Sequence, residues 1–267
     1  MALTALCAKI NTFTFSIKHP ETFQIAASLP IPQPSTLVGA LAYCLGIQQE
    51  MGLKSQEIVR NHVVIARAKL VGGVTVVNPI ILRRFRVLDK GFEKKGKGEE
   101  EAFKKAINAY QEGDINTFRR IIEETLTDAF YREYLSPATL KCVWILRSPI
   151  ESKILYLLQR LGDTESLVNV AEAWSAECKI ECLDSVSTDY YFAALWDIVS
   201  AVHGNYTVIK MCDEERKLKL YYVPCKKEVR STHSGIKYFV YTPAKVNVEL
   251  RRPQEVYFID EECIMGV

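Results

Sequence analysis

A basic segment near the end of the chain holds the residue best suited to acid–base chemistry. His233 lies in the run Ser-Thr-His-Ser-Gly, and the cations that flank it are Lys226, Lys227, Arg230 and Lys237. A histidine with lysine and tyrosine nearby can activate a ribose 2′-hydroxyl and protonate the leaving oxygen, as a metal-independent endoribonuclease does. Histidines in loops usually have no catalytic task, so a plain surface loop is the competing interpretation.

Basic side chains also gather between residues 67 and 97, where they could bind the phosphates of a nucleic acid. They come from two predicted strands, over residues 62–70 and 75–88, and from the glycine-rich stretch 89–98. The set comprises Arg67, Lys69, Arg83, Arg84, Arg86, Lys94, Lys95 and Lys97. Cations in such loops contact phosphates without reading bases. A solvated loop without function has the same composition, and that alternative stays open.

The chain must fold so that these cations share a surface, and its composition is that of an ordinary globular protein. It has 267 residues, of which 48% are hydrophobic and 25% charged. No apolar run is long enough for a membrane span, and no secretory signal opens the chain, so we expect a soluble, cytoplasmic protein. Basic blocks over residues 1–90 and 210–252 flank an acidic block over 161–200, which suits a polyanion-binding face and a separate protein-contact face.

Motifs for metals and cofactors are missing from the sequence. The eight cysteines form no paired Cys-x-x-Cys knuckles, so we expect no metal site. Neither a phosphate-binding glycine loop nor a His-Glu-x-x-His or Gly-x-Ser-x-Gly motif occurs, so we expect no cofactor.

The stretch 29–46, LPIPQPSTLVGALAYCLG, organises the first part of the chain. Its three prolines favour an extended segment, after which Ser35 and Thr36 can cap a short helix that ends at Gly46. The apolar stripe of that helix consists of Leu37, Leu41 and Leu45. The spacing alone favours a helix that packs on a sheet over a ligand-binding loop.

Hydrophobic periodicity predicts a strand over 2–17 before this helix and two strands after it, over 62–70 and 75–88. The Gly72-Gly73 pair between the last two indicates a hairpin. Strand, helix, strand, hairpin and strand make up the first half of a β-α-β-β-α-β unit. Lys18 and His19 follow the first strand, so an RNA-phosphate contact is possible there, although a surface histidine is the default.

The second half of the unit is interrupted. Helical spacing predicts a helical insertion over about 99–135 and then a strand over 138–146. A capping box from Ser148 to Glu151 predicts the second helix, and the closing strand falls within 167–182. We therefore predict a first domain over 1–200 and a β-rich subdomain over 201–267.

The opening strand and the stretch 29–46 resemble the N-terminal signature of the CRISPR-associated protein five family, in which a proline-rich turn leads into a Ser/Thr-Gly-x-Leu helix that closes on glycine. The match covers roughly residues 3–46. The resemblance implies an α+β protein of the RAMP superfamily, with an RRM-like ferredoxin fold, a β-hairpin thumb and a C-terminal extension. The long insertion is most similar to that of archaeal type I-A members.

The resemblance further implies a non-catalytic subunit of a type I surveillance complex (Cascade) in antiviral defence. Such a subunit grips the crRNA 5′ handle and contacts the repeated backbone subunit and the large subunit, and the complex recruits a helicase-nuclease. Free amides at the start of the helix, at Ser35, Thr36 and Gly39, would then receive a handle phosphate. One subtype of the family cleaves RNA with a Tyr/Lys/His set, for which only His233 and its neighbours are candidates here.

Overall fold

The computed structural model describes residues 3–21, 25–85, 97–163 and 165–266. The chain forms two compact units, the larger over residues 1–22, 27–78 and 133–267, the smaller over 23–26 and 79–132. The boundary predicted at residue 200 therefore falls inside the larger unit. No helix in the described part of the chain is both long and apolar enough to cross a membrane.

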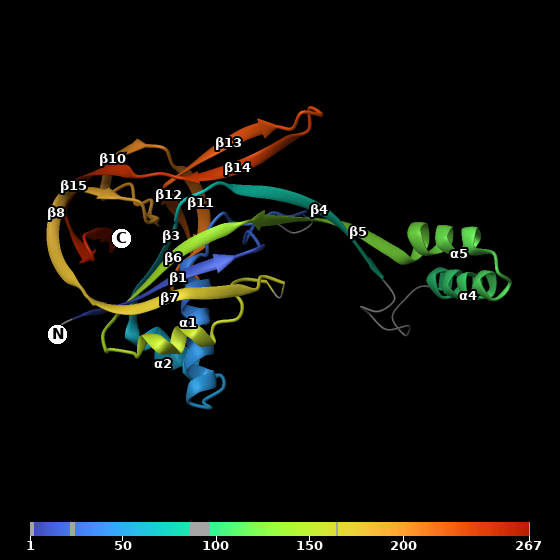
Figure 1. The fold of residues 1–267 in the computed structure, drawn as a ribbon, viewed down its shortest axis with the longest axis horizontal. Helices are drawn as coiled ribbons and strands as arrows, with labels where there is room; N and C mark the ends of the chain where they lie inside the picture. The colour runs from blue at the N-terminus through green and yellow to red at the C-terminus, as the bar shows by residue number, and fades with distance from the viewer. Residues whose placement is uncertain (1–2, 22–24, 86–96, 164, 267) are drawn as a thin grey trace. The chain divides into compact units, whose positions relative to one another are not determined.

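A four-stranded antiparallel sheet lies at the centre of the larger unit (Figure 1). Its strands are β1 (Thr4–Thr12), β3 (Val63–Leu70), β6 (Ala138–Leu146) and β7 (Val168–Glu177). They lie in the order β3-β6-β1-β7, and each neighbouring pair is antiparallel. The strand predicted over 138–146 is thereby confirmed, and the predicted closing strand is β7.

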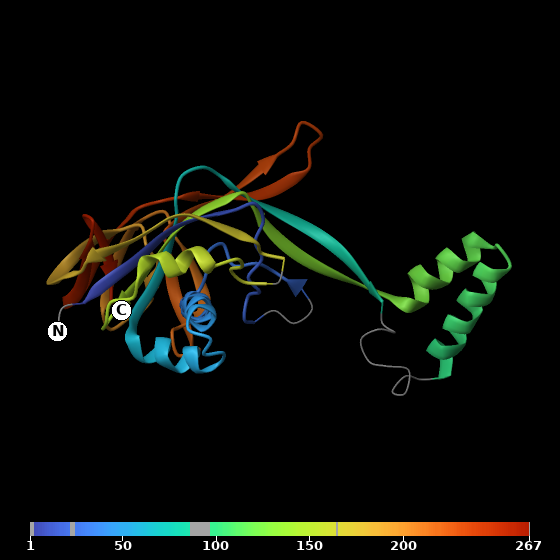
Figure 2. The same ribbon diagram turned by 60° about the horizontal axis from the view of Figure 1, so that its bottom comes forward.

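Three helical elements contribute to the larger unit: α1 (Pro34–Gln48), α2 (Lys54–His62) and the 3-10 helix η3 (Ser152–Leu157). Figure 2 shows α1 and η3 on the same side of the sheet. Leu37, Leu41 and Leu45 of α1 are buried in one core cluster with the sheet residues that face them, as predicted. Each such leucine contributes about 1.5–3 kcal/mol by leaving water. The Trp144 indole N–H donates to the Leu37 carbonyl at 2.9 Å, which joins β6 to α1.

Two predicted helix starts are wrong in detail. Helix α1 begins at Pro34, with Gln33 as its N-cap and no side-chain cap, so Ser35 and Thr36 lie inside the first turn. Proline suits the first helical position because the amide it lacks would have no partner there. The helix predicted from a capping box at Ser148 is instead the short η3, which follows Glu151 without a side-chain cap.

The second face of the sheet is covered as well. A C-terminal sheet contains β8 (Lys179–Thr188), β10 (Val199–Gly204), β15 (Val246–Ile259) and β16 (Glu262–Met265). The cluster between the two layers comprises Ala5, Cys7, Ile65, Val143, Ile145, Tyr190, Tyr257, Ile259 and Ile264. Strand β1 is therefore apolar on both faces because both are buried.

The predicted hairpin between β3 and the next strand is wrong. Gly72 and Gly73 have positive φ angles of 62° and 71° and turn the chain, but β4 (Thr75–Phe85) leaves the central sheet. Its first residues, Thr75 and Val76, pair instead with β14 (Lys237–Pro243). The third strand of the unit is thus β6, and β4 starts an excursion of the chain between β3 and β6.

Two further groups of strands complete the larger unit. The hairpin of β13 (Cys225–Ser231) and β14 is antiparallel over its whole length. A small sheet has the order β11-β12-β9, with β11 (Thr207–Cys212), β12 (Leu218–Val223) and β9 (Phe192–Ala193).

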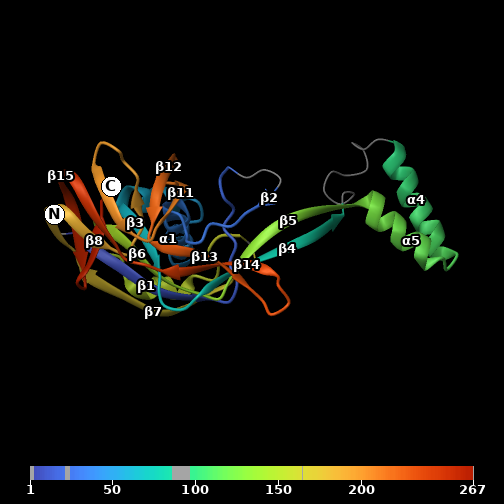
Figure 3. The ribbon, with the colours of Figure 1, turned by 90° about the horizontal axis from the view of Figure 1, so that it is seen from above.

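The smaller unit carries two helices, α4 (Lys97–Gln111) and α5 (Ile115–Ile121), which lie side by side (Figures 1 and 3). Gly113 has a φ of 79°, and the Asp114 carboxylate caps α5 by accepting the Thr117 N–H at 3.0 Å, so the predicted division between two helices is confirmed. A π-helical turn (Ile122–Leu126) follows. The predicted helical insertion extends too far, because residues 127–135 belong to strand β5 (Thr127–Ser136), which pairs with β2 (Ile25–Ala26).

Candidate nucleic-acid interface

Arg67, predicted to bind RNA, is buried inside the larger unit. It is 3% exposed, and its guanidinium donates to the Glu214 carboxylate at 2.6 Å. The guanidinium also lies 5.6 Å and 5.8 Å from the ring centres of Tyr191 and Tyr221. Burial lowers the pKa of Arg67, but the Glu214 carboxylate together with Tyr221 and Tyr191 outweighs this effect and leaves the pKa above its usual value. Arg67 is therefore charged, stabilises the core through its contact with Glu214, and does not face solvent.

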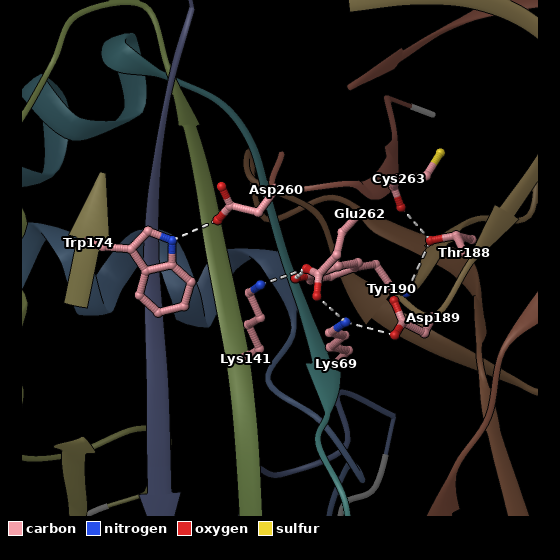
Figure 4. A network of polar contacts seen from close by, with 9 residues as sticks. All are labelled: Lys69, Lys141, Trp174, Thr188, Asp189, Tyr190, Asp260, Glu262 and Cys263. Carbon is pink, nitrogen blue, oxygen red and sulfur yellow. Dashed lines mark hydrogen bonds and ion pairs between the residues drawn. The ribbon is translucent and has the colours of Figure 1, made fainter. Parts of the chain in front are cut away.

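Lys69 is also buried, and Figure 4 shows the polar network that holds it. Its ammonium donates to Asp189 at 2.7 Å and to Glu262 at 2.8 Å. Lys141 forms a second ion pair with Glu262 at 2.8 Å, and the Tyr190 hydroxyl donates to the same carboxylate at 2.6 Å. The network ties β3 and β6 to β16, so Lys69 fixes the C-terminal layer on the sheet. The predicted cationic face of β3 is wrong because this layer covers it.

The remaining cations of the predicted set belong to the excursion that begins with β4. Arg83 and Arg84 lie near the end of β4, and Lys97 is the first residue of α4. Arg86, Lys94 and Lys95 fall outside the described residues. Their predicted contacts with RNA remain predictions.

The start of α1 lies beside cations that the sequence did not connect with it. Thr36 and Gly39 line a cavity of about 440 Å³ together with Arg160, which follows η3. Ser35 and Gly39 line a smaller hollow with Arg60 and Arg216. Ser35 and Thr36 are half-buried, whereas Gly39 is exposed and has open space where a Cβ would lie. Arg60, Arg160 and Arg216 are far apart in the sequence and approach the start of α1 only in the folded chain. No local sequence pattern therefore predicts that they lie near it.

His19 lines a different cavity of the larger unit, with a volume of about 540 Å³. The charged and aromatic residues around this cavity come from separate strands: Lys210 of β11, Lys227 of β13, Tyr241 of β14 and Glu133 of β5. Lys18 is exposed, and its backbone forms a bridge with Ser28 at the same edge. The predicted pairing of Lys18 and His19 at one edge is therefore seen, although the cavity itself was missed.

Hydrogen bonds and ion pairs fix the polar groups of this cavity. The Glu21 N–H donates to His19 Nδ1 at 3.3 Å, and the Glu21 carboxylate forms an ion pair with Lys210. The Ser28 N–H donates to Glu133 Oε2 at 3.1 Å. These contacts set the orientation of the imidazole and of the Glu133 carboxylate before any ligand binds.

The β13–β14 hairpin, whose ribbon Figure 3 shows, contributes Lys227 and Tyr241 to this cavity and carries exposed cationic and apolar side chains. Its cations are Lys226, Lys227, Arg230 and Lys237, all exposed. Exposed apolar side chains alternate with them: Val229 is 58% exposed, Ile236 65% and Phe239 45%. Cations interleaved with exposed rings are typical of surfaces that bind single-stranded nucleic acids. We call these seven residues, which are distributed over the two faces and the turn of the hairpin, the hairpin surface.

From the sequence, the four cations of the hairpin surface were identified only as neighbours of His233. The strand register puts Lys227, Val229, Phe239 and Lys237 on one face of the hairpin and Lys226 and Arg230 on the other. The period-two alternation of the two strands was the sequence signal for this division. Glu228 pairs with Lys226 at 2.5 Å and with Arg230 at 3.4 Å, and it is the single acid of the hairpin. The hairpin thus keeps a net positive charge.

His233 lies in the turn that joins β13 and β14 and is exposed. The turn is closed by a hydrogen bond of 2.7 Å between the Thr232 and Ser234 hydroxyls, and Gly235 has a φ of 82°. Within the described ranges, no three His, Cys, Asp or Glu side chains are grouped closely enough to hold a metal ion.

Comparisons with known proteins point to one family. No family model matches the chain. The chain is 25% identical over 215 residues to a protein of Thermoproteus tenax named CRISPR-associated protein Cas5, covering 80% of this chain and 82% of the relative. A protein of the same name from Methanocaldococcus jannaschii is 28% identical over 196 residues, covering 68% and 67%. A crystal structure of a CRISPR protein from Archaeoglobus fulgidus has the same fold, with a TM-score of 0.60, 15% identity and 98% of each chain covered.

Proposed function

Because this chain belongs to the Cas5 family of CRISPR-associated proteins, we propose that it is a non-catalytic RNA-binding subunit of a Cascade-like surveillance complex in antiviral defence. Its ligand is the 5′ handle of the crRNA. The observation that carries this proposal is the hairpin surface, whose exposed cations and exposed Phe239 ring lie next to the cavity that His19 lines. Handles are read as single strands through backbone contacts and stacked bases, which require this combination of side chains.

The central sheet supports a finer assignment of the fold. Its strands follow one another in the chain as β1, β3, β6 and β7, with α1 after the first and η3 after the third. This is the order of a β-α-β-β-α-β unit, and we assign it to the RRM-like ferredoxin fold of the RAMP superfamily. In this assignment, the excursion from β4 to β5 is the thumb. RNA cannot use the sheet face in the usual way, since the C-terminal layer covers it.

The proposed partners follow from the same family. The subunit contacts the repeated backbone subunit and the large subunit, and the assembled complex recruits a helicase-nuclease. The acidic block over 161–200 suits protein rather than RNA contacts, because its charge repels phosphates. We place the chain in type I-A, the subtype that its long insertion resembles, and in the cytoplasm.

The direct test is to measure the affinity for a repeat-derived 5′-handle RNA against an unrelated RNA of equal length. The measurement uses the purified chain alone and together with its backbone subunit. A preference for the handle supports the proposal. Equal affinity for both RNAs in both settings contradicts it.

A second candidate function is the maturation of repeat RNA by metal-independent cleavage. It is favoured by the exposure of His233 at the tip of a cationic hairpin, where RNA can reach the imidazole. Incubation of the protein with repeat RNA in EDTA tests it. Cleavage that is lost in His233→Ala would establish this function, whereas intact RNA, or cleavage unchanged in the variant, rejects it.

A further inference from the structure

Strands β7 and β8 follow each other directly in the chain, and each has a strand partner on one side only. Figure 1 shows them as one curved ribbon. β7 pairs with β1, and β8 pairs with β15. The N–H of Val168, at the start of β7, donates to the Gln159 carbonyl at 3.0 Å. Beyond Val168, no segment in the described ranges hydrogen-bonds to the backbone on the other side of either strand, which we call the open edge.

The open edge has few of the features with which proteins usually prevent further strand pairing, such as short strands, lysines and prolines. β7 and β8 have ten residues each, about twice the usual strand length. Neither contains a proline, and Lys179 is their single lysine. A register shift opposite Lys9 and Ile10 interrupts β7 near its start, but residues 172–177 pair with β1 without interruption. The edge is therefore regular enough to accept another strand.

The charge of the open edge limits what can bind there. Its acids are all exposed: Glu172, Glu177, Glu181 and Asp184. Glu172 pairs with Lys9 at 3.6 Å, whereas the other three have no ion pair with any described residue. These carboxylates repel the phosphates of RNA. They also disfavour a second copy of this chain, because like charges on neighbouring strands destabilise the pair.

A strand that carries lysine or arginine has the complementary charge. We propose that the open edge binds an extended, cationic segment of a second protein, which pairs with β7 and β8 as an additional strand. In this mode of binding, main-chain hydrogen bonds give affinity and alternate side chains give specificity. Ile180 is 47% exposed between the acids, so an apolar side chain of the segment can pack on it.

This inference rests on the proposed function for the choice of probe. A subunit that coats an RNA needs cationic segments to neutralise phosphates, so the probe is the repeated backbone subunit, prepared free of RNA. Its affinity is measured for wild type and for the double variant Glu177→Lys/Glu181→Lys. We expect binding to weaken about tenfold, since each reversal turns an attractive cross-strand pair into a repulsive one. Glu57→Lys/Glu215→Lys reverses two exposed acids away from the open edge and should bind as wild type does.

Hydrogen exchange separates strand addition from attraction between charges alone. In the complex, the β7 amides that face away from β1 gain partners, so alternate amides of β7 should exchange at least about tenfold more slowly. This measurement uses the wild-type protein, and it therefore decides even if the double variant does not fold.

Three results would overturn the inference: no binding of the backbone subunit to wild type, equal affinity for wild type and Glu177→Lys/Glu181→Lys, or binding that leaves the β7 amides unprotected. Protection of these amides by handle RNA without the subunit would overturn it as well. The preference of the chain for handle RNA is measured separately. A chain whose β7 amides are protected by the subunit but that shows no handle preference keeps this inference and loses the proposed function.

Discussion

The Arg67 guanidinium lies 2.6 Å from the Glu214 carboxylate, within the core of the larger unit. Arg67 is on β3, and Glu214 is in the turn between β11 and β12, so the contact joins residues 147 positions apart in the chain. The same carboxylate accepts the Ala66 N–H at 3.0 Å. Arg67, which was predicted to bind RNA, therefore holds this turn against the edge of the central sheet.

Arg67→Ala should lower the free energy of unfolding by about 3 kcal/mol, because it removes the ion-pair partner of Glu214 in a partly buried site. Chemical denaturation at neutral pH measures this loss. Handle affinity, measured under conditions where the variant is folded, should stay near the wild-type value. A variant of unchanged stability that no longer binds RNA would contradict the structural role.

Glu262→Gln should change how stability depends on pH. Burial raises the pKa of Glu262, but hydrogen bonds from Lys141, Lys69 and Tyr190 outweigh it and leave the pKa below its usual value of 4.5. A carboxylate with a lowered folded-state pKa stabilises the protein above its unfolded pKa, and this contribution is lost as the pH falls through the folded value.

The variant should therefore be less stable than wild type at pH 7, and the two unfolding free energies should converge as the pH falls below 4.5, the usual value, and through the lowered folded-state pKa. Denaturation series at several pH values check this. Glu151→Gln, which removes a carboxylate from an exposed ion pair with Lys153, is the matched control and should follow the wild-type curve. A gap between wild type and Glu262→Gln that stays constant down to pH 3 would rule out the ion-pair network as its cause.

Two glycines of α1 should respond oppositely to alanine. Gly39→Ala should raise stability by about 0.5–1 kcal/mol, since the site is exposed and helical and has open space for a Cβ. At Gly46 a Cβ would lie 2.9 Å from Ser55 Oγ and 3.2 Å from the Gly52 carbonyl, so Gly46→Ala should cost about 1 kcal/mol. Thermal denaturation of both variants measures these changes. Equal shifts of the melting temperature in the two variants would contradict the packing of α2 on α1.

The sequence predicted what local periodicity encodes. The buried stripe of Leu37, Leu41 and Leu45 was correct because helical spacing determines which side of α1 is apolar. The predicted strand partner of β4 was wrong, because the choice between β3 and β14 depends on residues more than 150 positions away. Arg67 and Lys69 were misread for the same reason: their partners Glu214 and Glu262 come from distant segments. The alternation of residues in β13 and β14 could have predicted the hairpin surface from the sequence. The cavity of His19 and Glu133 could not be predicted in this way, because its lining comes from distant segments.

The central claim is that the hairpin surface binds RNA, and the salt dependence of handle affinity tests it most directly. Lys226, Lys227 and Lys237 are replaced together by alanine; Lys153, Lys179 and Lys245, exposed elsewhere on the larger unit, form the charge-matched control. Binding constants are measured across salt concentrations. The hairpin variant should lower the slope of log affinity against log salt by about two units, at about 0.7 per lost phosphate contact, and the control should keep it. An unchanged slope in the hairpin variant, or an equal loss in both variants, would contradict the claim.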